Sequence, residues 1–150
     1  MSDDQSPPAF DPALFNNNPH AKRVEKPWGY ELHWVPAERS YMGKIEHINA
    51  GRRMSLQIHD QKQESWLLIS GRAKVIWEDN TGKLIETELQ RGQGYSTAIG
   101  QKHRLVGITD CDIVEVSTSE IGTTWRLEDD YDRPHETPEQ RSKERNEDIQ

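Results

Sequence analysis

The 150-residue chain has one cysteine, Cys111, so it cannot form an internal disulfide bond. That suits a reducing compartment. The longest strongly apolar run is about four residues, Trp66 to Ile69, whereas a membrane-spanning helix needs roughly 20. The N-terminus also lacks the basic and apolar regions of a secretory signal. We therefore expect a soluble, cytoplasmic protein with no membrane partner.

An excess of positive charge is missing as well. The chain has 19 Lys and Arg against 26 Asp and Glu, which gives a formal net charge of −7. Because proteins that bind nucleic acid usually carry a basic face, this composition argues against nucleic acid as a partner. Hydrophobic residues make up only 32% of the chain, which is lean for a fully packed domain and indicates that part of it is unpacked.

The unpacked parts are expected at the two ends. Residues 1–20 contain four prolines and neither Lys nor Arg, and residues 133–150 contain one large aliphatic residue, Ile149. We predict a flexible N-terminal arm over residues 1–22, a folded domain over residues 23–132, and a charged, disordered tail over residues 133–150.

The middle of the chain alternates short apolar–polar segments with turn residues, and it has no sustained helical period. The expected strands are 30–35, 41–48, 53–59, 65–70, 73–78, 83–89, 95–99, 103–108 and 112–118. Many short strands separated by glycine-bearing turns predict an all-β sandwich or small barrel in a single domain.

One stretch, SLQIHDQKQESW (55–66), holds several possible metal ligands. Alternate side chains of a barrel strand point inward, so if His59 faces the interior, Gln57 and Gln61 also do while the strand stays regular. Glu64 could re-enter from the next strand, and His103 begins a strand about 40 residues later. These residues are consistent with a metal site, or with a metal-free cluster held by hydrogen bonds.

Four ordered motifs carry a resemblance to a known family. They are VEKPWGYE (24–31), the stretch from Gly51 to Gly71 that contains SLQIHDQKQESW, the segment from Gly92 to Leu105, and RLEDDY (126–131). Together they resemble the C-terminal cupin domain of type II mannose-6-phosphate isomerase, a bifunctional enzyme that also has guanylyltransferase activity. The resemblance implies a cupin, that is, a double-stranded β-helix or jelly-roll barrel, and it implies a homodimer.

The resemblance also implies a divalent metal ion (Zn, Mn, Fe, Ni or Co) held by His59, Glu64 and His103. The family's second metal histidine falls on Gln61, which would be an unusual fourth ligand. The stretch is also similar to the S-[IL]-Q-x-H-P-x-K motif of type I mannose-6-phosphate isomerases, in which case Gln57 would be the fourth ligand. The sequence leaves both glutamines open.

The activity implied by the resemblance is metal-dependent aldose–ketose isomerisation of a sugar phosphate. Lys62, where the family has an arginine, and Glu64 are the candidate catalytic residues. Three basic residues are candidates to bind the substrate's phosphate: Lys44, Arg53 and Arg104. Two alternatives stay open. One is an Fe(II)-type cupin oxygenase, because two histidines and one carboxylate are the ligand set that such iron sites use. The other is a metal- or ligand-binding cupin without isomerase activity, because three positions of the first motif, 61, 62 and 65, depart from the family.

Overall fold

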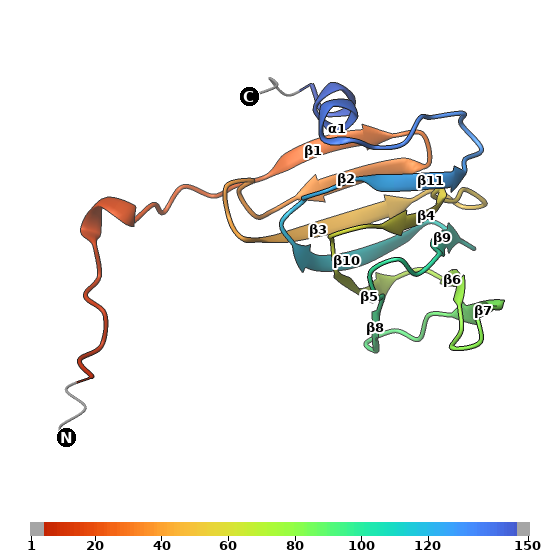
Figure 1. Cartoon of the computed structure of the whole chain (residues 1–150), viewed down its shortest axis with the longest axis horizontal. Helices are drawn as coiled ribbons and strands as arrows, with labels where there is room; N and C mark the ends of the chain where they lie inside the picture. The colour runs from red at the N-terminus through yellow and green to blue at the C-terminus, as the bar shows by residue number, and fades with distance from the viewer. Residues whose placement is uncertain (1–4, 147–150) are drawn as a thin grey trace.

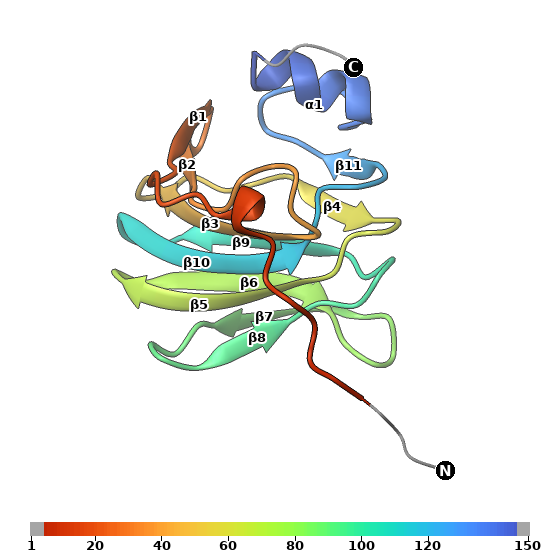
Figure 2. The ribbon, with the colours of Figure 1, turned by 90° about the vertical axis from the view of Figure 1, so that its left-hand side faces the viewer.

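The computed structural model describes residues 5–146 and confirms the all-β prediction (Figures 1 and 2). Its strands form two antiparallel sheets. The first sheet runs, in spatial order, β1 (Lys22–Lys26), β2 (Gly29–His33), β3 (Tyr41–Ile48), β10 (Cys111–Thr118), β5 (Glu64–Ser70) and β8 (Gly94–Ser96). The second runs β11 (Thr124–Glu128), β4 (Leu56–His59), β9 (His103–Gly107), β6 (Ala73–Glu78) and β7 (Leu84–Glu88).

The apolar core fills one half of the interior between the sheets. Its buried members include Trp66, Val75, Leu105 and Ile113. The turn between β5 and β6 depends on Gly71, whose φ of +74° and close approach to the Asp110 carbonyl leave no room for a side chain. This core therefore anchors β5, β6, β9 and β10 around one end of the barrel.

The other half of the interior is lined with charged side chains. On β3 the inward positions Lys44 and Glu46 are followed by Ile48, and on β10 Ile113 is followed by Glu115. The period of two is thus kept while the residue type changes from apolar to charged. Buried charges are costly unless paired, so this half of the barrel has to be held together by ion pairs.

The N-terminal arm precedes β1 and extends away from the barrel (Figure 1). Residues 5–21 are exposed and contain one short 3-10 helix, η1 (Pro12–Leu14). Phe10, Leu14 and Phe15 each expose more than two thirds of their surface. The flexibility expected for this arm stays a prediction.

The C-terminal segment differs from the disordered tail that its composition predicts. Glu136 pairs with Thr124 of β11, and α1 (Pro138–Glu144) follows, with the Thr137 side chain accepting from the Gln140 amide. Arg141 and Arg145 are buried. The segment needs few apolar residues because its charges are paired: Arg141 and Arg145 lie against Glu120, and Arg126 of β11 lies against Glu136 and Glu144. Residues 147–150 of the predicted tail lie outside the described residues.

The helix lies on the side of the barrel that carries β1 and β11, above β1 in Figure 1 and above β11 in Figure 2. It has seven residues. Nowhere in residues 5–146 is a helix long and apolar enough to cross a membrane.

Candidate metal centre

His59, Glu64 and His103 meet inside the polar half of the barrel. They stand at the end of β4, the start of β5 and the start of β9, and their ligand atoms all lie within 4.8 Å of one another. Glu64 Oε1 is 3.2 Å from His59 Nε2 and 2.9 Å from His103 Nε2. All three side chains are buried. The chain bends between β4 and β5, and this bend brings Glu64 back to the interior.

The hydrogen bond of His103 Nδ1 determines whether His103 Nε2 carries a hydrogen when the ring is neutral. His103 Nδ1 lies 2.9 Å from the Gln101 carbonyl oxygen. A carbonyl oxygen only accepts, so Nδ1 carries the hydrogen, and the Nε2 lone pair of the neutral ring faces Glu64 Oε1. Two acceptors at this distance need a proton or a cation between them. The donor set therefore fits a bound cation.

His59 is held in a comparable way. Its Nδ1 lies 2.8 Å from Thr124 Oγ1, which leaves Nε2 directed at Glu64. Burial lowers the pKa of His59, although the Glu64 carboxylate opposes this shift. A neutral imidazole is the form that binds metals, so the environment of His59 favours the metal-binding form.

The two candidate glutamines lie in different environments. Gln57 pairs with His103 across β4 and β9, and its Nε2 lies 3.4 Å from His103 Nε2. Turning the amide over would direct its oxygen at the same point, since the oxygen and nitrogen ends occupy similar space. Gln61 is exposed in the bend after β4, beside Gly122. Because β4 ends at His59, the alternation that would point Gln61 inward does not continue. The structure thus brings Gln57, and not Gln61, to the three residues.

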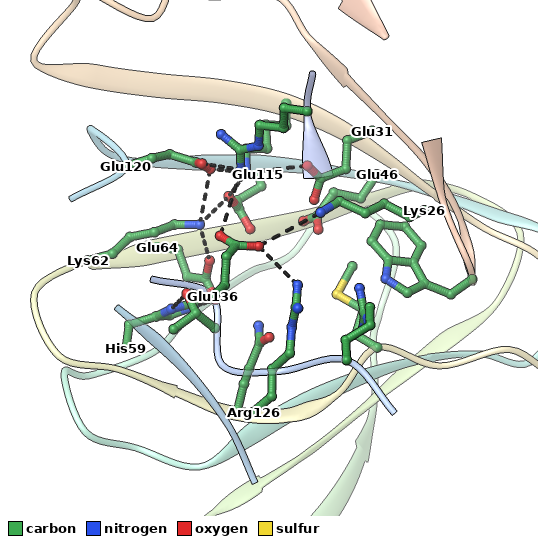
Figure 3. Close-up of a pocket in the computed structure, with 17 residues that line it drawn as sticks. Lys26, Glu31, Glu46, His59, Lys62, Glu64, Glu115, Glu120, Arg126 and Glu136 are labelled. Carbon is green, nitrogen blue, oxygen red and sulfur yellow. Dashed lines mark hydrogen bonds and ion pairs between the residues drawn. The ribbon is translucent and has the colours of Figure 1, made fainter. Parts of the chain in front are cut away.

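Lys62 lies next to the trio and is buried among carboxylates (Figure 3). Its Nζ is 3.2 Å from Glu64 Oε2 and 3.1 Å from Glu115 Oε2. Burial would lower its pKa, but Glu115 and Glu64 together raise the pKa well above the usual value. Lys62 is therefore a buried ammonium group. Glu64 is correspondingly ionised, because Lys62 and His59 lower its pKa more than burial raises it.

The three candidate phosphate-binding residues are not gathered in one place. Lys44 lies in the barrel and pairs with Glu31, Glu115 and Glu120.

Arg53 forms a two-pronged pair with Asp130, with both nitrogen–oxygen distances at 2.8 Å. Arg104 donates to the carbonyls of Met54 and Glu128. Consecutive strand residues point to opposite faces. His103 faces the interior, so Arg104 faces away from it, and neither arginine lines the inner pocket.

Sequence reasoning missed a network of buried charges around the trio. Its further members that line the inner pocket are Lys26, Glu31, Glu46, Glu115, Glu120, Arg126, Glu136 and Arg145. Charged residues at core-facing positions of β3 and β10 were the available signal, since they break an otherwise apolar alternation. Burial and the neighbouring Glu64 raise the pKa of Glu115 to about 7.

The inner pocket that these residues line has a volume of about 40 Å³. A cavity of this size holds a few water molecules, because one water needs roughly 10–15 Å³ by the same kind of measure.

Two antiparallel sheets that enclose a cluster of two histidines and one glutamate define the chain as a cupin. Oxalate decarboxylase from Lactobacillus farciminis, in its formate complex, superposes with a TM-score of 0.61 at 19% identity, covering 71% of this chain and 34% of that one. Oxalate decarboxylase from Bacillus subtilis at pH 4.6 gives a TM-score of 0.60 at 16% identity, covering 71% and 30%. At this level of identity the likeness shows the fold alone.

The family is shown by sequence. The family described as "Mannose-6-phosphate isomerase C-terminal" matches residues 16–134, and the chain belongs to it. The alginate biosynthesis protein AlgA of Pseudomonas aeruginosa is 34% identical over 120 residues, which cover 75% of this chain and 23% of AlgA. The xanthan biosynthesis protein XanB of Xanthomonas campestris is 31% identical over 117 residues, covering 75% and 24%. The chain thus spans about a quarter of the length of these curated relatives.

Proposed function

We propose that the chain is a metal-dependent isomerase that interconverts the aldose and ketose forms of a sugar phosphate, with mannose 6-phosphate as the first candidate. The observation that carries the proposal is the convergence of His59, Glu64 and His103 beside the buried ammonium of Lys62, in a chain of the isomerase C-terminal family. A divalent metal ion bound at the trio would polarise the substrate's carbonyl group.

The residues of the chain have separate tasks in this proposal. His59, His103 and Glu64 hold the metal, and Gln57 supplies a fourth donor beside His103. Aldose–ketose conversion moves one proton from C2 to C1 and another between the two oxygens, so a group that exchanges protons has to lie close to both carbons. Lys62 is a better candidate for this group than Glu64, because the Glu64 carboxylate is already directed at both imidazoles. Because its pKa is raised, Lys62 starts as an ammonium group, so it can donate a proton or a hydrogen bond to a substrate oxygen, and it would have to lose a proton before it could take the one on C2.

The test is turnover of mannose 6-phosphate to fructose 6-phosphate with Zn²⁺, Mn²⁺, Fe²⁺, Ni²⁺ or Co²⁺ added in turn. A solved structure of Bacillus subtilis oxalate decarboxylase is described as having Mn(II) centres, which makes Mn²⁺ a sensible first choice. We expect turnover in the natural chain and none in His59→Ala. If the natural chain, with metal demonstrably bound, is no faster than His59→Ala, the isomerase proposal is wrong.

A metal-dependent oxygenase is the second candidate, because two histidines and one carboxylate are also the ligand set of non-haem Fe(II) oxygenases. Oxygen consumption by the Fe²⁺-loaded protein would distinguish it from an isomerase. A binding module without catalysis would bind a sugar phosphate and show neither activity.

The homodimer expected from the family resemblance stays a proposal. Light scattering of the purified chain tests it directly, since a dimer has twice the 17.4 kDa mass of one chain.

A further inference from the structure

The loop that joins β8 to β9, residues 97–102, is hydrogen-bonded to all three members of the metal trio. The Thr97 amide donates to the Glu64 carbonyl oxygen at 3.1 Å, and the Gly100 amide donates to the His59 carbonyl oxygen at 2.9 Å. The remaining histidine donates through its Nδ1 to a carbonyl oxygen of the same loop. One short segment, which we call the β8–β9 loop, therefore contacts three candidate ligands that come from three different strands.

The side chain of Gln101 determines the shape of this loop. Its Oε1 accepts from the Ala98 amide at 2.9 Å, and the backbone amide of Gln101 donates to the Ala98 carbonyl oxygen at 3.2 Å. Gly100, between them, has a φ of +79°, which glycine adopts more easily than other residues. The side chain of Gln101 thus closes the turn that directs its own carbonyl oxygen at His103 Nδ1, 2.9 Å away.

The same side chain connects the loop to the rest of the barrel. Gln101 Nε2 donates to the Glu78 carbonyl oxygen at 2.8 Å. Glu78 is the last residue of β6, and its Oε1 accepts from the Lys102 amide at 2.7 Å. The Glu78 amide also donates to the Lys102 carbonyl oxygen at 3.0 Å. Because β6 contributes Ala73 and Val75 to the apolar core, Gln101 and Glu78 fasten the β8–β9 loop to a well-packed strand.

The position of these two residues leaves the loop as their main partner. Neither Gln101 nor Glu78 lines the inner pocket, and neither belongs to the apolar core. Both ends of the Gln101 amide are used, since Oε1 accepts within the loop and Nε2 donates to β6. A side chain with only an acceptor, or with neither group, could not make both bonds.

We propose that Gln101 is a positioning residue of the metal centre and that Glu78 supports it. By fixing the β8–β9 loop, the two residues keep the trio in the arrangement in which its ligand atoms can share one cation. Groups outside the ligand set that orient a ligand typically account for about 10–100-fold in metal affinity. This inference rests on the metal site of the proposed function, and it does not depend on isomerase activity.

The test compares two glutamine substitutions by competition with a metal-binding dye. Gln101→Met keeps a side chain of similar length but removes the amide donor and acceptor. Gln93→Met makes the same change at an exposed residue directly before β8. We expect Gln101→Met to weaken Mn²⁺ or Zn²⁺ binding by about tenfold or more, and Gln93→Met to leave it unchanged. Natural affinity in Gln101→Met, or an equal loss in both variants, would overturn the proposal.

A measurement on the metal-free chain separates positioning from a general loss of stability. The proton on His103 Nδ1 is hydrogen-bonded to the Gln101 carbonyl oxygen, so we expect a proton NMR signal that exchanges slowly with water and is absent in His103→Ala. In folded Gln101→Met this proton should exchange faster or lose its signal. If Gln101→Met only lowers the free energy of unfolding, and its folded form keeps the natural signal and exchange rate, the proposal is wrong.

Glu78 offers a matched pair of substitutions that decides the question if Gln101→Met does not fold. Glu78→Gln and Glu78→Met change the net charge equally, but only glutamine retains a side-chain oxygen that can accept from the Lys102 amide. We expect Glu78→Gln to bind Mn²⁺ or Zn²⁺ about tenfold more tightly than Glu78→Met. Equal affinities in the two variants, or the reverse order, would count against the proposal.

The failure of this inference can be told apart from the failure of the proposed function. If the natural chain binds metal and the substitutions at Gln101 and Glu78 leave the affinity unchanged, only the positioning role is contradicted. If these substitutions weaken metal binding as expected and the natural chain does not isomerise a sugar phosphate, only the proposed function is contradicted.

Discussion

His103 Nε2 lies 2.9 Å from Glu64 Oε1, and the hydrogen bond from His103 Nδ1 to the Gln101 carbonyl leaves this nitrogen without a proton when the ring is neutral. In that form a lone pair and a carboxylate oxygen face each other inside the barrel, and a proton or a cation has to lie between them. The hydrogen bond to the Gln101 carbonyl thus leaves His103 Nε2 as the ring nitrogen that could bind a metal.

The structure predicts that Gln57, rather than Gln61, supports metal binding. Gln57→Ala should weaken the affinity for Mn²⁺ or Zn²⁺ by about tenfold or more, as is typical when a group next to a metal site is removed. Gln61→Ala should leave the affinity unchanged, because Gln61 is exposed in the bend. Competition with a metal-binding dye measures both. A larger effect of Gln61→Ala would place the fourth donor in the bend.

Replacing Lys62 should destabilise the fold. Lys62→Met keeps most of the length of the side chain but removes the ammonium partner of Glu64 and one of the two ammonium partners of Glu115. Breaking a buried pair in this way costs about 3–5 kcal/mol. The matched change Lys74→Met, in a partly exposed pair with Glu86, should cost less than about 1 kcal/mol. Urea unfolding of the metal-free chains gives both values. Equal costs would show that the network around Lys62 contributes little.

The attachment of the C-terminal segment should depend on pH through Glu136. Burial raises the pKa of this carboxyl, but Lys26, Arg145 and Arg141 outweigh burial and lower it to about 2, with Glu120 opposing them. Arg126 donates to Glu136 as well. A carboxyl whose pKa is lowered by folding stabilises the folded state above its unfolded pKa, and that contribution is lost as the pH falls through the folded pKa.

We therefore expect the natural chain to exceed Glu136→Gln in unfolding free energy at neutral pH, with a difference that shrinks as the pH falls from about 4.5 towards 2. Urea titrations of both chains across this range measure it. Glu88→Gln, in the exposed pair with Arg72, serves as the control and should differ little from the natural chain at any pH. A constant difference for Glu136→Gln would contradict the assignment.

Most of the barrel could be predicted from alternation and turns. The expected strand at 41–48 is β3, and the one at 73–78 is β6, each with the same bounds. β1 and β11 were not predicted, because the predicted strands run only from residue 30 to residue 118. The segment after residue 132 could not be predicted, because the burial of its Arg141 and Arg145 depends on pairing with Glu120, which lies outside the segment, in the loop before β11. Composition measures apolar content and carries no information on such pairing.

The site, like the fold, has residues that could be predicted from the sequence and residues that could not. His59, Glu64 and His103 were expected together because the motifs that contain them resemble those of the isomerase family. The difference between Gln57 and Gln61 could not be resolved, since it depends on β4 ending at His59. Arg53 and Arg104 were expected near a phosphate because both match positions that are basic in the family and because a guanidinium group binds phosphate oxygens well. Which face of a strand an arginine occupies is decided by its register, as the inward position of its neighbour His103 shows.

Elemental analysis after incubation with Mn²⁺ or Zn²⁺ and desalting measures whether His59, Glu64 and His103 hold a divalent metal ion. We expect about one ion per chain in the natural protein and in the control His20→Ala, which changes an exposed residue of the arm, and almost none in His59→Ala or His103→Ala. A natural chain that retains no metal, or a His103→Ala chain that retains as much as the natural one, would contradict this expectation.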